Sequence, residues 1–155
     1  MNSPLFPPQT ITYLEAVHIP LRLSCVTTSG WPTVLSLWYL HDAGRLYCAT
    51  LETARVVTYL RREPRCGFEV AADQPPYCGV RGRAVAEIDP TLGLDVLGRL
   101  LDRYLGNRSN SLARRLLARS QDEVAIVLTP VQVFTWDYRQ RMADAAPSQL
   151  EKICP

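Results

Sequence analysis

The chain has 155 residues, of which 47% are hydrophobic and 21% are charged. These values are typical of a globular protein that buries its own core, so we expect one domain over residues 1–155. The formal net charge of +2 at pH 7 is too small to favour a nucleic-acid partner. No stretch has the length and apolar character of a membrane span, and the N-terminus lacks a signal-peptide pattern. We therefore expect a cytoplasmic protein that does not enter a membrane.

The cysteine pattern favours free thiols over disulfides or metal ligands. The cysteines are odd in number, widely spaced and mostly inside apolar runs, as reduced core thiols of a cytoplasmic protein are. No C-x-x-C pair exists, and neither His18 nor His41 has a second ligand at metal spacing, so we expect no metal site. The cysteines are Cys25, Cys48, Cys66, Cys78 and Cys154.

Residues 44–70 predict a strand, a polar corner, a short amphipathic helix and a second strand. Val56, Val57 and Leu60 form an apolar stripe at helical spacing within this segment. The helix is expected to end before Pro64, because the residue preceding a proline is pushed out of the helical region.

The polar corner in front of this helix has two interpretations. Thr50, Glu52 and Thr53 supply oxygens suited to capping the helix, and Arg55 follows within one turn. Hydroxyls, free backbone N–H groups and a guanidinium at a helix N-terminus together also suit a phosphate. The local sequence alone favours the simpler interpretation, in which the threonines cap the helix and Arg55 is solvated.

The other elements follow from periodicity and turn residues. We expect an N-terminal arm (1–9), a helix (10–17), a three-stranded antiparallel meander (22–28, 33–40, 45–50), strands at 65–71 and 77–88, helices from 89–91 to 106 and at 109–120, strands at 123–128 and 131–138, and a tail (140–155). Six or seven antiparallel strands with short helices inserted predict an α+β domain built on a small β-barrel.

Several motifs in this order resemble the pyridoxamine 5'-phosphate oxidase-like superfamily, the split β-barrels that bind FMN or F420. Each motif is weak alone, but the ordered set is fairly specific for the fold and much less specific for the reaction. The motifs are LSCVTT (23–28), SGWP (29–32), LSLWY (35–39), GRLYCAT (44–50), TAR (53–55), REPRC (62–66), VRGRAV (80–85) and PVQVFTWD (130–137).

The resemblance implies a homodimer with cofactor sites at the subunit interface. It implies that residues 35–38 line the flavin ring, that Ala49, Thr50 and Thr53 approach the ribityl chain and phosphate, and that Arg55 binds the phosphate. The residues it places at the cofactor are Leu35, Ser36, Leu37, Trp38, Ala49, Thr50, Thr53, Arg55, Val56 and Trp136 of the partner subunit. The polar corner, which could bind an anion, and the phosphate site that the resemblance implies therefore coincide at Arg55.

The sequence departs from the family pattern at two points. Ala54 stands where members often carry the first of two adjacent basic residues, which leaves room for help from Arg81 or Arg83. The arginine-rich C-terminal signature of the true pyridoxamine phosphate oxidases is absent, so we do not expect that activity.

The resulting hypothesis is an FMN-dependent oxidoreductase that acts on an unidentified small molecule. One alternative is an F420-dependent reductase, whose polyacidic tail Arg61, Arg62 and Arg65 would suit. A second is a non-enzymatic flavin- or haem-binding protein. No catalytic residue can be named from the sequence, and the proton-donor candidates Tyr39, Tyr47 and Tyr77 are expected to be core or interface aromatics instead.

Overall fold

The strands and helices lie in the order predicted from periodicity, with two changes among the strands that are described below. The computed structural model describes residues 5–144 and 153–155. The helices are α1 (Pro8–Ala16), α2 (Arg55–Arg62), α3 (Gly93–Leu105) and α4 (Ser111–Leu117), with a 3-10 turn, η1 (Ser120–Asp122), before the last strand. The strands are β1 (Leu21–Val26), β2 (Pro32–Leu37), β3 (Leu40–Asp42), β4 (Arg45–Leu51), β5 (Arg65–Ala71), β6 (Cys78–Asp89) and β7 (Glu123–Asp137).

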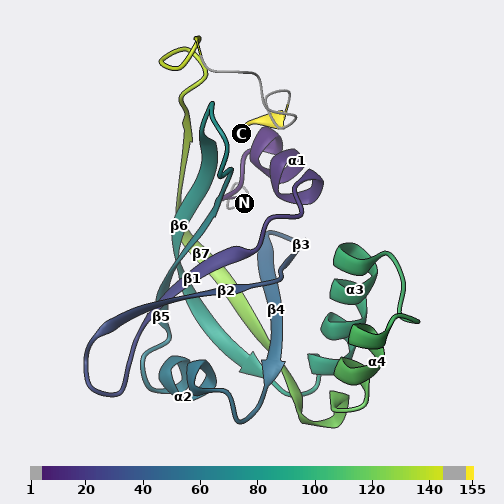
Figure 1. Cartoon of the computed structure of the whole chain (residues 1–155). Coiled ribbons are helices and arrows are strands. Elements are labelled where there is room, and N and C mark those ends of the chain that lie inside the picture. Colours follow the sequence, from purple (N-terminus) through teal and green to yellow (C-terminus); the bar gives the residue numbers. More distant parts are fainter. Residues whose placement is uncertain (1–4, 145–152) are drawn as a thin grey trace.

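Over the described residues the strands form one antiparallel sheet of seven, in the order β2-β1-β5-β6-β7-β4-β3. This order places β2 and β3, which follow one another in the chain, at opposite edges of the sheet. Only Trp38 and Tyr39 join them, and so short a link spans roughly 10 Å at full extension. The sheet therefore has to curl until its two edges approach each other (Figure 1).

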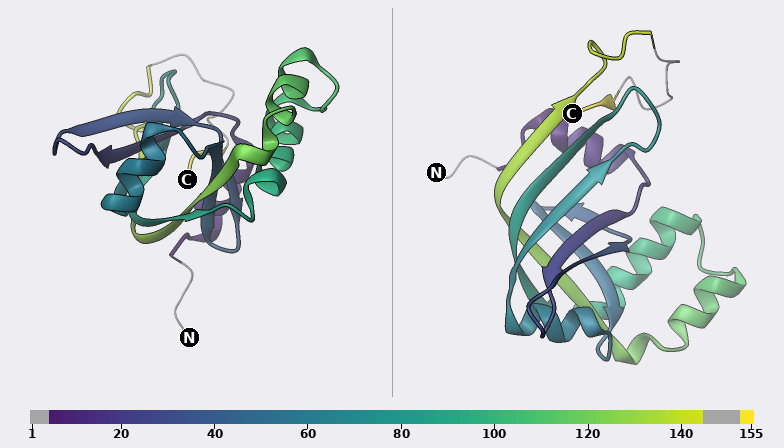
Figure 2. Two further views of the ribbon diagram at one scale, coloured as in Figure 1. Left: turned by 90° about the horizontal axis from the view of Figure 1, so that it is seen from below. Right: turned by 60° about the vertical axis from the view of Figure 1, so that its left-hand side comes forward.

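The inside of the curled sheet is the main hydrophobic core. Alternate residues of the strands point inward, as Leu21, Leu23 and Cys25 of β1 do, and are buried. α1 packs against one end of the barrel and α2 against the other, while α3 and α4 lie outside it beside β4 and β7 (Figures 1 and 2). None of the helices described is long and apolar enough to cross a membrane.

The predicted meander is wrong at its middle strand. Residues 33–40 were expected to form one strand paired with 45–50, but β2 pairs only with β1, and β3 is a separate short strand. The break occurs where Tyr39 turns into the core, fully buried, and donates a hydrogen bond of 2.7 Å to the carbonyl of Leu14. A continuous apolar run conceals this break, because both strands and the link between them are partly buried.

The two strands expected at 123–128 and 131–138 are one continuous strand, β7. Pairing with β6 shifts register between Arg83 and Ala84, which face Gln132 and Pro130 respectively. Val131 is therefore the extra residue of a β-bulge. Proline is tolerated in a strand at such a point because the ladder is already interrupted there.

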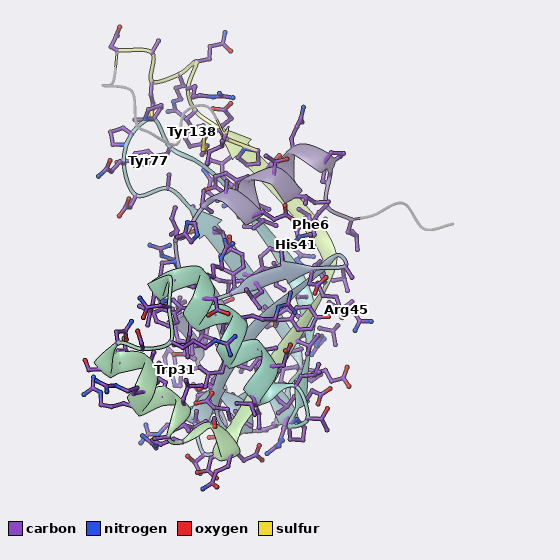
Figure 3. All side chains as sticks on the ribbon, turned by 90° about the vertical axis from the view of Figure 1, so that its right-hand side faces the viewer. Phe6, Trp31, His41, Arg45, Tyr77 and Tyr138 are labelled. Atoms are coloured by element: carbon purple, nitrogen blue, oxygen red, sulfur yellow. A yellow bond between two sulfur atoms is a disulfide. The ribbon has the colours of Figure 1, made fainter. Side chains whose placement is uncertain are left out.

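Both ends of the chain contribute to the core. Phe6, in the expected arm, is 1% exposed and packs edge-on against the His41 ring at a centroid distance of 5.5 Å (Figure 3). Cys154 forms a disulfide with Cys78, so the expectation of five reduced thiols is wrong for this pair. The remaining cysteines are free and buried. Part of the expected tail, residues 145–152, lies outside the described residues.

We expect the Cys78–Cys154 disulfide to be a large contributor to stability, because it joins positions 76 residues apart. Replacing Cys154 by Ser should lower the free energy of unfolding by roughly 2–4 kcal/mol in urea melts under oxidising conditions. In the presence of a phosphine reductant the wild type should lose most of this difference. Detection of five reactive thiols in the unfolded, unreduced protein would contradict the assignment.

Candidate functional site

The curling of the sheet leaves a seam between two open strand edges. β2 is paired on one side only, as the first strand of the sheet order. β3 covers β4 only along Arg45–Tyr47, so the edge of β4 from Cys48 to Leu51 has no strand partner among the described residues. Open edges carry backbone N–H and C=O groups that need hydrogen-bond partners. The seam is therefore suited to a ligand with several hydrogen-bonding groups along its rim.

Two cavities lie along this seam and share Thr50. The first, which we call the Trp38 cavity, has a volume of about 340 Å³, and the second, the Arg55 cavity, about 360 Å³. Of the residues predicted from the sequence, the Trp38 cavity is lined by Ser36, Leu37, Trp38, Ala49 and Thr50. The Arg55 cavity is lined by Leu35, Thr50, Arg55 and Val56. The structure thus brings eight of the ten predicted positions to one seam, whereas Thr53 and Trp136 line neither cavity.

The N-terminus of α2 opens toward the Arg55 cavity and has no side-chain cap. Ala54 occupies the N-cap position with φ −65° and ψ 138°, and no side chain accepts a hydrogen bond there. The expectation that Thr50, Glu52 or Thr53 caps this helix is therefore wrong. The first N–H groups of a helix lack intrahelical partners, so those of Arg55 and Val56 are available to an anion, which the helix dipole also favours.

The arginines near this corner fall into two groups. Arg61 forms an ion pair of 2.6 Å with Glu52, Arg62 donates to the carbonyl of Thr28, and Arg65 forms an ion pair of 2.6 Å with Glu63. The Arg65 guanidinium lowers the pKa of Glu63 to about 2.

By contrast, Arg55 is exposed, lines its cavity and has no ion pair within the described part of the chain. Arg81 and Arg83 lie on the outer face of the sheet, in a different cavity beside Phe134. Arg55 is thus the arginine that the described part of the chain offers at the N-terminus of α2.

Trp38, which lines its cavity, is held in place by an aromatic stack with Tyr104 of α3. The rings of Trp38 and Tyr104 lie 4.9 Å apart at an angle of 5°. The hydroxyl of Tyr104 lies 3.4 Å from the carbonyl of Ile19, and the backbone N–H of Tyr39 donates to that hydroxyl over 3.4 Å. The link between β2 and β3 is therefore fixed against α3, and Trp38 is held at the seam.

The tyrosines do not provide an evident proton donor at the seam. Tyr39 is buried with its hydroxyl already bonded to Leu14, and burial raises its pKa. Tyr47 is partly buried against the hydrophobic cluster that Leu40 forms with residues of α3 and β7. Tyr77 lies near Tyr138, and its carbonyl accepts a hydrogen bond from that residue's N–H (Figure 3). None of the three lines either seam cavity.

Sequence reasoning missed Glu123, which lines the Trp38 cavity and is buried. The signal available was the second of two adjacent acidic residues, at the start of the apolar run EVAIVL, and an ordinary strand boundary has the same pattern. Trp136 lies on β7 opposite Gly79, with the Arg81 guanidinium 5.3 Å from its ring centroid.

Comparison with solved structures identifies the type of fold. No family model matches the sequence, and no curated protein matches it. Among solved structures, the chain is similar to an F420 reductase, with TM-score 0.70 and 23% identity over 83% of this chain and 98% of that one.

The chain is also similar to a conserved hypothetical protein from Mycobacterium tuberculosis, with TM-score 0.74, 19% identity and coverage of 96% and 94%. A third similar structure is a putative pyridoxamine 5'-phosphate oxidase from Listeria innocua, with TM-score 0.62, 17% identity and coverage of 81% and 93%. The chain therefore has the split β-barrel fold of the pyridoxamine 5'-phosphate oxidase-like proteins, as the sequence motifs predicted.

The uncapped helix yields a prediction about stability. Ala54→Ser adds a neutral cap and should stabilise the ligand-free protein by about 1 kcal/mol in urea melts, and Ala54→Asp should do the same. Only the aspartate adds a negative charge, so it alone should abolish the rise in melting temperature that added inorganic phosphate produces in the wild type. If neither substitution stabilises the protein, the N–H groups of α2 already have partners.

Proposed function

We propose that this chain is an FMN-dependent oxidoreductase of the pyridoxamine 5'-phosphate oxidase-like type, acting as a single domain over residues 1–155. It binds FMN at a homodimer interface and transfers hydride to or from a small molecule. The observation that carries this proposal is the convergence at Thr50 of two open strand edges, an uncapped helix N-terminus and the exposed Arg55.

The chemistry of the seam supports FMN. In the proposal, Arg55 and the N–H groups of Arg55 and Val56 hold the phosphate, with Thr50 and Thr53 alongside. The open edges of β2 and β4 offer backbone donors and acceptors to the polar rim of the ring, and Ala49 leaves space beside it. FMN supplies the hydride-carrying ring when bound, and the protein supplies position, exclusion of water and electrostatics.

The alternatives fit the described residues less well. F420 carries a polyacidic tail, but Arg61, Arg62 and Arg65 are engaged with Glu52, Thr28 and Glu63 respectively. Haem binding would need an axial ligand at the seam. Neither His18 nor His41 lines the two seam cavities; instead, His41 contacts Glu15 at 3.3 Å and His18 packs against Tyr104.

The homodimer is supported by an apolar patch on the outer face of the sheet. Val34 is 66% exposed and Phe134 44% exposed, and both line one cavity with Arg22 and Arg81. Val131, exposed at the bulge of β7, lines the adjoining cavity on this face. Such a contiguous exposed patch typically marks an interaction surface. In the proposal a second copy covers it and brings Trp136 of the partner subunit near the ring.

A cytoplasmic location remains part of the proposal. The Cys78–Cys154 disulfide bears on it, because disulfides are rare in cytosolic proteins of mesophiles. Trapping thiols with an alkylating agent during cell lysis, followed by mass spectrometry, will show which form of this pair the cell holds.

Arg55→Ala is the test of the phosphate site. The loss of a charged hydrogen bond should weaken FMN binding roughly tenfold to a hundredfold, measured by quenching of flavin fluorescence on titration. Stability should change little, because Arg55 is exposed. Arg62→Ala is the matched control, since it removes the same charge from the same helix but from a side chain held by Thr28. Equal FMN affinity in the wild type and Arg55→Ala would rule out the assignment.

Phe134→Asp is the test of the interface. We expect the wild type to be a dimer by light scattering at micromolar concentration and Phe134→Asp to be a monomer with weakened FMN binding. Leu94→Asp serves as the control, because Leu94 is 56% exposed on α3 and lines neither outer-face cavity. The interface site would be contradicted if the wild type were a monomer and bound FMN with the same affinity as Phe134→Asp.

A further inference from the structure

An unpartnered carboxyl group lies in the wall of the Trp38 cavity. Glu123, the first residue of β7, is 7% exposed and is the only buried acidic residue among those described. It lines the cavity with Trp38, Thr50 and Leu97. Within residues 5–144 and 153–155 its side chain forms neither a hydrogen bond nor an ion pair. Its carboxyl oxygens are not sealed from solvent, although the residue as a whole is buried, so the carboxyl group opens into the cavity, where a ligand can reach it.

The burial of Glu123 depends on a close approach of α3. A Cβ atom at Gly93 would lie 2.0 Å from the carbonyl oxygen of Glu123, so only glycine lets the first turn of α3 rest on this part of the backbone. Leu97 and Leu100 of the same helix, with Leu116 of α4, complete the apolar wall around the carboxyl group. The cavity therefore presents one acid within mainly apolar surroundings.

The electrostatic surroundings keep a proton on this group to a higher pH than usual. Burial raises the pKa of the Glu123 carboxyl, and the guanidinium of Arg119 opposes this only in part. Glu52, which directly follows β4, donates its backbone N–H to the carbonyl of Asp122, and its side chain is paired with Arg61 at 2.6 Å. From η1, the neighbouring Asp122 is exposed. Carboxyl groups with raised pKa values in clefts are recurrent proton donors and acceptors in enzymes.

We propose that Glu123 is the acid–base residue of the Trp38 cavity, where it exchanges a proton with a neutral, largely apolar ligand that carries a carbonyl oxygen. This inference rests on the proposed function for its hydride source. In the reducing direction the reduced cofactor supplies the hydride, the O–H bond of Glu123 breaks, and its proton bonds to the ligand oxygen. The ligand thereby gains two electrons and two hydrogens, and the carboxylate recovers a proton from water. Oxidation runs through the reverse steps.

The experiment uses dicyclohexylcarbodiimide, a neutral apolar reagent that modifies a carboxyl group only by first accepting its proton. The proton moves from the carboxyl oxygen to a carbodiimide nitrogen, and the carboxylate oxygen bonds to the central carbon, without any redox change. Peptide mapping by mass spectrometry of the full chain locates the adduct. At about pH 6 we expect labelling of Glu123 to exceed that of Asp122 at least about tenfold, and to fall as pH rises.

Glu123→Gln provides an independent readout in the ligand-free protein. Because the folded-state pKa is raised, protonated Glu123 stabilises the fold at low pH, and this stability is lost as pH rises through the folded pKa. The variant should therefore have a higher melting temperature than the wild type near pH 7 and lose this advantage below about pH 4. Asp122→Asn, which changes the exposed neighbour, should show neither effect.

The outcomes separate the two proposals. If Glu123 is labelled no more than exposed carboxyls, or its labelling does not depend on pH, the acid–base assignment fails. If Glu123 is labelled as expected but the protein takes up no FMN, the assignment of the group stands and the cofactor proposal fails. Protection of Glu123 from the reagent by FMN would support both, because it would place the cofactor at the same cavity.

Discussion

The two-residue link between β2 and β3 is the constraint on which the rest of the structure depends. Strands that are adjacent in the chain usually pair with each other, but here Trp38 and Tyr39 connect opposite edges of the sheet. The sheet must curl to satisfy so short a link, and it closes around a core without completing the hydrogen bonding of a barrel. The seam and its cavities are consequences of this incomplete closure. An open edge is normally a liability for a β-protein, and one lined by cavities is better explained by a ligand than by folding alone.

The contacts of the arginines show which of these side chains remains available to bind a ligand. In the local sequence, Arg55, Arg61, Arg62 and Arg65 are four surface cations close to the same polar corner. The structure gives the last three acceptors nearby and leaves Arg55 at a helix end. A charge that already has a partner must lose it before it can bind a ligand, so the usable cationic site is much smaller than the arginine content suggests.

The fold was predictable from the sequence where local pattern and tertiary structure agree. β5 matches its expected bounds, and the apolar stripe of Val56, Val57 and Leu60 is buried as periodicity predicts. The failures share one cause, which is that contacts distant in sequence decide them. Tyr39 interrupts an apolar run because Leu14 offers it an acceptor. Cys154 pairs with Cys78 across 76 positions without any spacing pattern to reveal it.

The residues of the candidate site were likewise predictable where the signal is local in the sequence and not where it depends on distant contacts. Residues near Arg55 could be found because a polar corner before a helix is a local signal, and family motifs supplied those around Leu35 and Trp38. Glu123 could not be found, because its burial requires α3 to rest on its backbone at Gly93. A charged residue at a strand boundary is usually solvated, and only the fold reveals that this one is not.

The position of Glu123 also links the stability of the protein to its chemistry. If the cavity served only to complete the core, an apolar side chain at position 123 would pack against Leu97 and Leu100 without the cost of removing a carboxylate from water. The fold instead accepts this cost beside the seam, where α3 packs against β4 and β7. A glycine in α3 that allows the close approach, an acid beneath it and an open strand edge beside it serve no common structural purpose. They have a common explanation if a ligand that needs a proton binds between them.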